Sequence, residues 1–314
     1  MTAQLFNNVA FVGLGLIGSS LALRIKQDGL AGKTCGFSRK AETRARIEEL
    51  GLVDQVHDNL ADTVKDADLI LICTPVGTYK QLAEDLAPHL KSGAIISDVG
   101  SVKKSVIDAL KPQLPSHVHL VPGHPIAGTE HSGPDAGFAE LFEDRWCILT
   151  PEDDCDQDAV NKVEQLWKAS GSMVEIMDAE HHDRVLAITS HLPHIIAYTI
   201  VGTATGLEES TQEEVIKYSA SGFRDFTRIA ASDPVMWRDI FLHNKDAVLE
   251  MLQRYSEDLT ALQRAIRHGQ GDVLEEHFTR TRSVRRSIID AKQAGQFSPT
   301  EASNENQPDW LSIY

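Results

Sequence analysis

The sequence has few cysteines and no excess of basic residues, and both shortages limit what the protein can be. Its four cysteines show no C-x-x-C spacing, so we expect reduced thiols in a cytoplasmic protein and not a disulfide scaffold. The formal net charge is −16 at pH 7, and a surface of that sign repels the phosphates of nucleic acids. We therefore expect no nucleic-acid partner.

Long apolar runs and targeting patterns are also missing. No run reaches the roughly 18 to 20 apolar residues that a membrane-spanning helix needs, so we expect no membrane partner. The first residues lack the basic segment and long apolar stretch of a signal peptide. Hydrophobic residues still make up 42% of the 314 residues, which is enough to bury a core and long enough for two domains.

The first half of the chain alternates short apolar runs with amphipathic stretches, which predicts a doubly wound α/β fold with helices on both faces of a parallel sheet. From about residue 178 glycine and proline become rarer and helical periodicity takes over. We predict a dinucleotide-binding domain over 1–177, an all-helical substrate and dimerisation domain over 178–296, and a polar tail over 297–314. The predicted strands of the first half are Val9–Val12, Thr34–Phe37, Leu69–Cys73, Ala94–Ser97 and His119–Val121, with Cys147–Thr150 and Met173–Ile176 as two further candidates.

A glycine motif, Gly13-Leu-Gly15-Leu-Ile-Gly18, connects the first predicted strand to a predicted helix. The three glycines permit a tight turn, close approach of a pyrophosphate, and close packing of helix on strand. Leu16 and Ile17 open the helix, whose free N–H groups and positive dipole end favour phosphate. The motif therefore predicts a dinucleotide site rather than a merely structural turn.

The choice between NAD and NADP depends on the end of the second predicted strand. An acidic residue there would hold the 2′-hydroxyl of NAD, but this sequence has Ser38 and Arg39. Both can bind a 2′-phosphate, so we favour NADP over NAD. The alternative interpretation is that these residues only form an exposed basic turn before the next helix. Thr74 and Pro75 follow another predicted strand, and we expect them near the nicotinamide together with Ser101.

Three groups of residues carry chemistry beyond the fold. They are Ser97–Lys103, Gly123–Glu130 with its G-H-P-I-A-G run, and the pair S-H-L-P-H at 190–194 and G-F-R-D-F-T-R at 222–228. These segments resemble the motifs of the prephenate/arogenate (cyclohexadienyl) dehydrogenases of tyrosine biosynthesis, from the glycine motif to about residue 245. The resemblance implies a Rossmann-type domain followed by a helical dimerisation domain, a small-molecule substrate and a homodimer.

The residues of these segments are candidates for individual roles, and the resemblance itself assigns the role of base to His124 and places Ser190 and His194 over the substrate. His124, which we expect in a Gly-His-Pro turn, is the candidate base, because an imidazole accepts a proton near neutral pH. Ser101 is expected to contact the substrate hydroxyl or to cap the next helix. Arg228 is the candidate clamp for a substrate carboxylate. The neighbouring Phe223 and Phe226 favour a partly buried setting for this arginine and for Arg224. The remaining expected substrate contacts are Arg224, His194, Ser190 and Thr129.

The sequence also allows other interpretations of its histidines and of its function. The histidines at 181–182 and 191–194 lack a three-ligand pattern with an open position, so we expect no metal site and read them as surface or site-wall residues. A β-hydroxyacid or 6-phosphogluconate type dehydrogenase, using a lysine of the helical half, is one alternative function. A non-catalytic dinucleotide-binding dimer is another.

Overall fold

The computed structural model describes residues 4–129, 131–206, 214, 217–218 and 220–290. They fall into a first compact unit that ends at Arg254 and a second that begins at Tyr255. The long helix α12, Lys245–Arg267, runs through this division. The division does not test the domain boundaries predicted from the sequence, which stay predictions, and the predicted tail lies outside the described residues.

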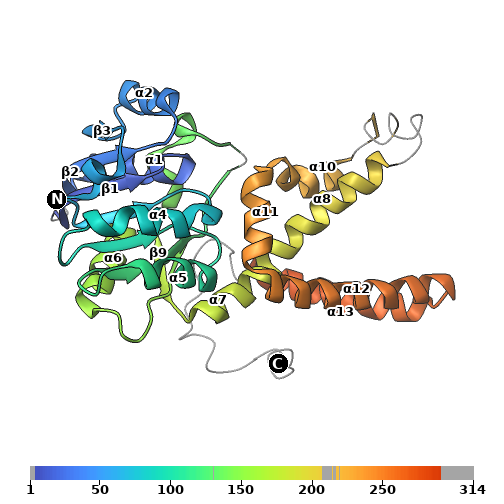
Figure 1. Ribbon diagram of the computed structural model, residues 1–314. Helices are drawn as coiled ribbons and strands as arrows, with labels where there is room; N and C mark the ends of the chain where they lie inside the picture. The colour runs from blue at the N-terminus through green and yellow to red at the C-terminus, as the bar shows by residue number, and fades with distance from the viewer. Residues whose placement is uncertain (1–3, 130, 207–213, 215–216, 219, 291–314) are drawn as a thin grey trace. The chain divides into compact units, whose positions relative to one another are not determined.

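The centre of the first unit is a parallel sheet covered by helices (Figure 1). It has six strands in the order β3-β2-β1-β4-β5-β6. This is the order of a Rossmann-type doubly wound sheet, so the predicted fold class is confirmed. The short strand β3 was not predicted, and most of the other strands differ from the predicted ranges by one or more residues. The strands are β1 Phe6–Val12, β2 Ala31–Phe37, β3 Gln55–His57, β4 Leu69–Ile72, β5 Ile95–Asp98 and β6 His119–Val121.

Side chains alternate between the two faces of this sheet, as the pleat requires. In β1, Val9 and Phe11 join one hydrophobic core, whereas Ala10 and Val12 join another. The first core is covered by α1, Leu16–Asp28, α2, Ala41–Glu49, and α6, Gln157–Ala169. The second core is covered by α3 Leu60–Val64, α4 Tyr79–Leu86, α5 Lys104–Leu110 and α11 Pro234–His243.

A second, three-stranded sheet holds β7, Gly123–Pro125, β8, Trp146–Leu149, and β9, Met173–Ile176, in the order β7-β8-β9. The sequence predicted that His124 lies in a turn, and this is wrong. Gly123–Pro125 is a short strand that pairs antiparallel with β8, with His124 opposite Ile148. Backbone pairing therefore fixes the position of His124 more firmly than a turn would.

The helical half begins with α7, Ala179–Leu186, where Asp178 caps the helix by accepting from the N–H groups of Glu180 and His181. A π-helical turn, Ala187–His191, then leads into α8, Leu192–Thr205. The remaining helices are α10 Ser221–Thr227, a 3₁₀ turn over Arg228–Ala231, α11, α12 and α13 Gly271–Asp290.

The helical stretch Ala179–Thr205 is long and apolar. Its most apolar window has a mean hydropathy of 1.4, and 28% of that window is buried, so by length and composition it could span a membrane. Exposed apolar side chains along it include Ile188 and Ile200. Exposed apolar side chains that gather on one helix are typical of an interaction surface.

Candidate active site

The glycine turn between β1 and α1 has the geometry that a dinucleotide requires. Gly13 has φ +92°, and a Cβ there would lie 2.9 Å from the carbonyl oxygen of Cys73. A Cβ at Gly18 would lie 2.5 Å from the carbonyl oxygen of Gly13, whereas one at Gly15 would meet no described atom within 4 Å. The start of α1 has no side-chain cap and no acid in its first turn, so its first N–H groups are suited to a pyrophosphate.

Loops at the carboxyl ends of the parallel strands lie next to this turn. Thr74 follows β4, and its methyl carbon would lie 2.8 Å from a Cβ at Gly13. Pro75 opens a short 3₁₀ turn, and the hydroxyls of Thr74 and Thr78 are 2.9 Å apart. Ser101 lies in the loop after β5. Ligands of doubly wound sheets bind at this edge.

The expectation that Ser101 caps the next helix is wrong. Helix α5 begins at Lys104, and its start has no side-chain cap from its own segment. Instead, the carboxylate of Asp183 on α7 accepts from the backbone N–H groups of Lys103 at 2.7 Å and Lys104 at 2.9 Å. A distant acid thus stabilises the N-terminus of α5, and the Ser101 hydroxyl is not used as a cap.

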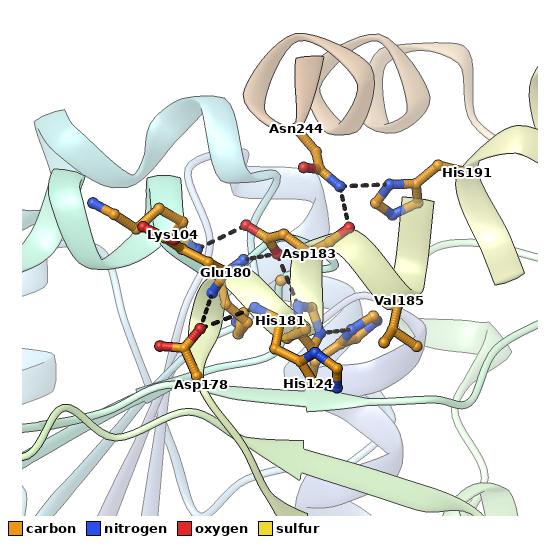
Figure 2. A network of polar contacts seen from close by, with 12 residues as sticks. Lys104, His124, Asp178, Glu180, His181, Asp183, Val185, His191 and Asn244 are labelled. Atoms are coloured by element: carbon orange, nitrogen blue, oxygen red, sulfur yellow. Dashed lines mark hydrogen bonds and ion pairs between the residues drawn. The ribbon is translucent and has the colours of Figure 1, made fainter. Parts of the chain in front are cut away.

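His124 is the first member of a buried hydrogen-bonded chain (Figure 2). Its Nδ1 lies 2.8 Å from Nε2 of His182, and Nδ1 of His182 lies 2.8 Å from Oδ1 of Asp183. His124 is 7% exposed and His182 is fully buried. The two rings meet edge to face with centroids 5.1 Å apart.

This chain fixes the positions of the ring protons. A carboxylate only accepts hydrogen bonds, so His182 donates from Nδ1 to Asp183 and its Nε2 must accept. Nδ1 of His124 is then the donor to His182, and the lone pair of His124 lies on Nε2. The geometry prepares Nε2 of His124 to accept a proton.

Burial also keeps these imidazoles neutral. It lowers the pKa of His124 well below 6.5, and the charges of His182, Lys103 and His191 add to the effect. Burial likewise lowers the pKa of His182, although its hydrogen bond to Asp183 opposes the shift. An unprotonated imidazole is the form that a general base needs.

A buried ion pair holds the residue before His124. Nζ of Lys103 donates to Oδ2 of Asp98 and to the carbonyl oxygen of Gly123, both at 2.6 Å, and both charged side chains are fully buried. The Asp98 carboxylate also accepts from the N–H of Gly123 at 3.1 Å and of Gly100 at 2.7 Å. Both polar groups of the Gly123 peptide are therefore bound by this ion pair, as is the segment next to Ser101.

The helical half contributes His194 and Arg228. The His194 ring stacks on Trp237 with centroids 3.6 Å apart, and its Nδ1 donates to the carbonyl oxygen of Ser190 at 2.9 Å. Burial lowers the pKa of His194, and the charge of Arg228 lowers it further. His194 in turn acts on His191, and His191 acts on His124, so these groups lie close enough to interact electrostatically.

Several of the expected substrate-binding residues are exposed and not buried like the histidine cluster. Arg224 and Arg228 are both exposed, and the neighbouring Phe226 is 41% exposed, so the partly buried setting expected for the two arginines is wrong. Thr129 is exposed, and its hydroxyl accepts from the N–H of His131. In the described residues no group of three or more His, Cys, Asp or Glu side chains could hold a metal ion.

His182 and Asp183 were not predicted as site residues from the sequence, where the histidines at 181–182 were interpreted as surface or site-wall residues. Both are buried on α7, together with Ala179 and Leu186. These four positions follow the i, i+3, i+4, i+7 spacing of a helix face directed to a core. This spacing can be seen in the sequence. Two polar residues on an otherwise apolar helix face indicate a buried polar network.

The sheet order and the glycine turn place the protein in the class of Rossmann-type dinucleotide-binding oxidoreductase folds,. Residues 21–176 match the profile of the prephenate dehydrogenase nucleotide-binding domain, and residues 178–280 match that of the prephenate dehydrogenase dimerization domain. The two matches cover most of the chain.

Individual relatives agree with the profiles. A cyclohexadienyl dehydrogenase of Zymomonas mobilis is 45% identical over 90% of this chain and 96% of its own length. A prephenate dehydrogenase of Bacillus subtilis is 35% identical over 90% of this chain and 76% of its own length. A solved prephenate dehydrogenase of Aquifex aeolicus, bound to hydroxyphenyl propionate and NAD+, has a TM-score of 0.84 and 34% identity, covering 92% of this chain and 99% of its own.

The chain belongs to the prephenate dehydrogenase family of oxidoreductases. The resemblance stated from the G-H-P-I-A-G, S-H-L-P-H and G-F-R-D-F-T-R segments is thereby confirmed. Neither the profiles nor the relatives support the two alternative functions considered from the sequence.

Proposed function

We propose that this protein oxidatively decarboxylates prephenate, arogenate or both, with NAD(P)+ as hydride acceptor, and so serves tyrosine biosynthesis in the cytoplasm. The products would be 4-hydroxyphenylpyruvate from prephenate and tyrosine from arogenate. The observation that carries the proposal is the buried chain from His124 through His182 to Asp183, in a member of this family.

The reaction needs one proton acceptor near the substrate hydroxyl. The bound nicotinamide supplies the chemistry of hydride acceptance from the carbon that bears this hydroxyl. Nε2 of His124 takes the hydroxyl proton as the carbon–oxygen bond gains double-bond character. The bond to the ring carboxylate then breaks, CO2 leaves, and the electron pair makes the ring aromatic with a phenolate oxygen, to which the proton can return. Aromatisation supplies much of the driving force, so the protein mainly positions groups.

The substrate-binding roles extend this proposal. Ser101 contacts the substrate hydroxyl and orients it toward His124. Arg228 holds a substrate carboxylate through a pair of parallel hydrogen bonds, and its electrostatic effect on His194 supports placing both near one ligand. Ser190, Arg224 and Thr129 complete the proposed set.

For the cofactor we propose a preference for NADP over NAD. No acid follows β2, where Ser38 and Arg39 stand. Arg44 donates to the carbonyl oxygens of Ser38 at 2.8 Å and Arg39 at 3.0 Å, and these two hydrogen bonds stabilise the backbone of the turn. An Arg39→Ala variant should lower kcat/KM with NADP+ more than with NAD+. A higher wild-type kcat/KM with NAD+, the cofactor of the Aquifex structure, would overturn the preference.

We also propose a homodimer. The family profile over residues 178–280 is a dimerization domain, and it includes the apolar helical stretch described above. A second copy would cover Ile188, Ile200 and their neighbours, which a monomer leaves exposed. Light scattering should give twice the mass of 34.6 kDa, whereas a monomer at micromolar concentration would contradict the proposal.

The experiment that tests the activity is an initial-rate assay. Purified protein is mixed with prephenate or arogenate and with NAD+ or NADP+, and the absorbance of the reduced nicotinamide is followed. We expect reduction with at least one pairing, together with stoichiometric release of CO2. Absence of reduction in all four combinations would refute the proposed function.

A further inference from the structure

We propose that Asn244, together with His191, is a positioning residue that links the two arms of the proposed catalytic centre. One arm is the chain from Asp183 to His124, and the other is the loop that carries Ser101. The inference rests on the proposed function, because it concerns how those two residues are aligned for the reaction.

Asn244 stands at the junction of α11 and α12 and is 6% exposed. Its Nδ2 donates to the backbone carbonyl oxygen of Asp183 at 2.8 Å and lies 3.1 Å from Nδ1 of His191 (Figure 2). A carbonyl oxygen can only accept, so the amide NH2 group must face these two atoms. Both hydrogens of the amide are then used, and Nδ1 of His191 is the acceptor.

This contact fixes the tautomer of His191. With Nδ1 accepting, a neutral His191 carries its proton on Nε2. Burial lowers the pKa of His191 to about 4, the charge of Asp183 opposes this shift, and interaction with the Ser101 backbone also raises the value. Nε2 of His191 is buried and makes no hydrogen bond to the described residues, so its N–H is an unused donor close to the backbone of Ser101.

The other contact of Asn244 reaches His124. The backbone carbonyl oxygen of Asp183 accepts a hydrogen bond from the Asn244 amide. The side chain of Asp183 accepts from His182 and from the backbone at the start of α5. A shift of Asp183 would move His182 and therefore the ring of His124. Asn244 consequently ties the Asp183 segment, which sets the ring of His124, to His191, whose buried Nε2–H faces the surroundings of Ser101.

Neither residue was assigned this role by its position in the sequence. Asn244 ends one helix and precedes another, where an asparagine is ordinary, and His191 was interpreted from the sequence as a surface or site-wall residue. The π-helical turn over Ala187–His191 is the local feature that accompanies the inward placement of His191. Turns of this type occur frequently at functional sites.

The test combines histidine ¹⁵N NMR with kinetics on the full chain. In the wild type we expect His191 as the Nε2–H tautomer and His124 as the Nδ1–H tautomer. Asn244→Asp removes the donor and supplies an acceptor, so His191 should change to Nδ1–H. Asn244→Ala and Asn244→Asp should lower kcat about 10- to 100-fold, the range expected for a misplaced catalytic group, with little change in the Kd of the cofactor.

His243→Ala is the matched control, because His243 is the exposed neighbour of Asn244 on the same turn, and it should keep wild-type kcat. A wild-type His191 with its proton on Nδ1 overturns the proposal without any variant. Unchanged tautomer and kcat in both Asn244 variants overturn it as well. Failure of wild-type turnover would instead refute the proposed function, while the NMR result still decides the role of Asn244.

Discussion

Burial has two opposite effects on His124 as a general base. Burial lowers its pKa well below 6.5, which makes it a weaker base at equilibrium but keeps it unprotonated at neutral pH. The substrate hydroxyl becomes more acidic as hydride leaves the same carbon, so a weak base suffices at that moment. The hydrogen bond from Nδ1 to His182 and on to Asp183 then stabilises the protonated ring.

Replacing Arg228 tests the residue proposed to hold the carboxylate. Arg228→Ala should raise KM for the substrate about 10- to 100-fold, because a hydrogen bond to a charged group contributes about 1.5–3 kcal/mol, while kcat changes much less. Steady-state kinetics at saturating cofactor measures both constants. Arg254→Ala removes an exposed arginine that pairs with Glu250 and is the control for net charge. A variant with unchanged KM would rule out the clamp.

At the scale of whole elements, the buried pair of Lys103 and Asp98 joins the end of β5 to the start of β7. Burial lowers the pKa of Lys103, while the charge of Asp98 opposes that shift. The pair also binds the Gly123 peptide and the Gly100 N–H. The short strand β7 is thereby stabilised twice, by its backbone pairing with β8 and by the hydrogen bonds of Gly123 to the ion pair.

Removing one member of this pair should be costly. Lys103→Met leaves the Asp98 carboxylate buried without its cation, and we expect a loss of about 3–5 kcal/mol in the free energy of unfolding. The double variant Lys103→Met/Asp98→Asn should recover part of that loss. Urea unfolding measures both, with Lys104→Met as the control, since the exposed pair of Lys104 and Asp108 should contribute less than about 1 kcal/mol. Equal losses in Lys103→Met and Lys104→Met would show that the buried pair has no special weight.

The elements differ in how well the sequence predicts them. Strands such as Leu69–Ile72, which are continuous apolar runs buried on both faces, were found to within a residue. β3, Gln55–His57, was missed because it is short and half exposed, and β7 was missed because glycine and proline are poor strand residues. Only tertiary pairing with β8 makes Gly123–Pro125 a strand.

The candidate site was predictable to a similar degree. The motifs predicted the glycine turn, His124 and the helical segments around His194 and Arg228 as parts of the site. They did not give His182, Asp183 or Asn244, whose roles depend on contacts between residues 58, 80 and 53 positions apart in sequence. No local pattern reports such contacts, although the apolar stripe of α7 marked two of these residues as buried.

For the molecule as a whole, the buried histidines predict a loss of stability in acid. His124, His182, His191 and His194 all have a lowered pKa, mainly through burial. The unfolded chain therefore binds more protons below pH 6.5, and the stability these neutral rings contribute is present above 6.5 and lost as the pH falls. For His191 the window runs from 6.5 to about 4, which corresponds to about 3 kcal/mol.

Urea unfolding at a series of pH values measures this loss. His191→Asn removes one titrating ring, so its unfolding free energy should depend less on pH between 6.5 and 4 than that of the wild type. His181→Asn, at an exposed position on α7, should keep the wild-type dependence. A flat wild-type profile across this window would contradict the neutral, buried state of these histidines.

The proposed reaction depends most on its proton acceptor, His124, and one variant tests this residue directly. His124→Asn keeps a polar side chain of similar size but has no basic nitrogen. Under single-turnover conditions with saturating cofactor and prephenate or arogenate, we expect the rate of nicotinamide reduction to fall about 100- to 10,000-fold, with the Kd of the cofactor unchanged. A rate within about threefold of the wild type, well short of the effect of a lost general base, would show that His124 does not accept the proton.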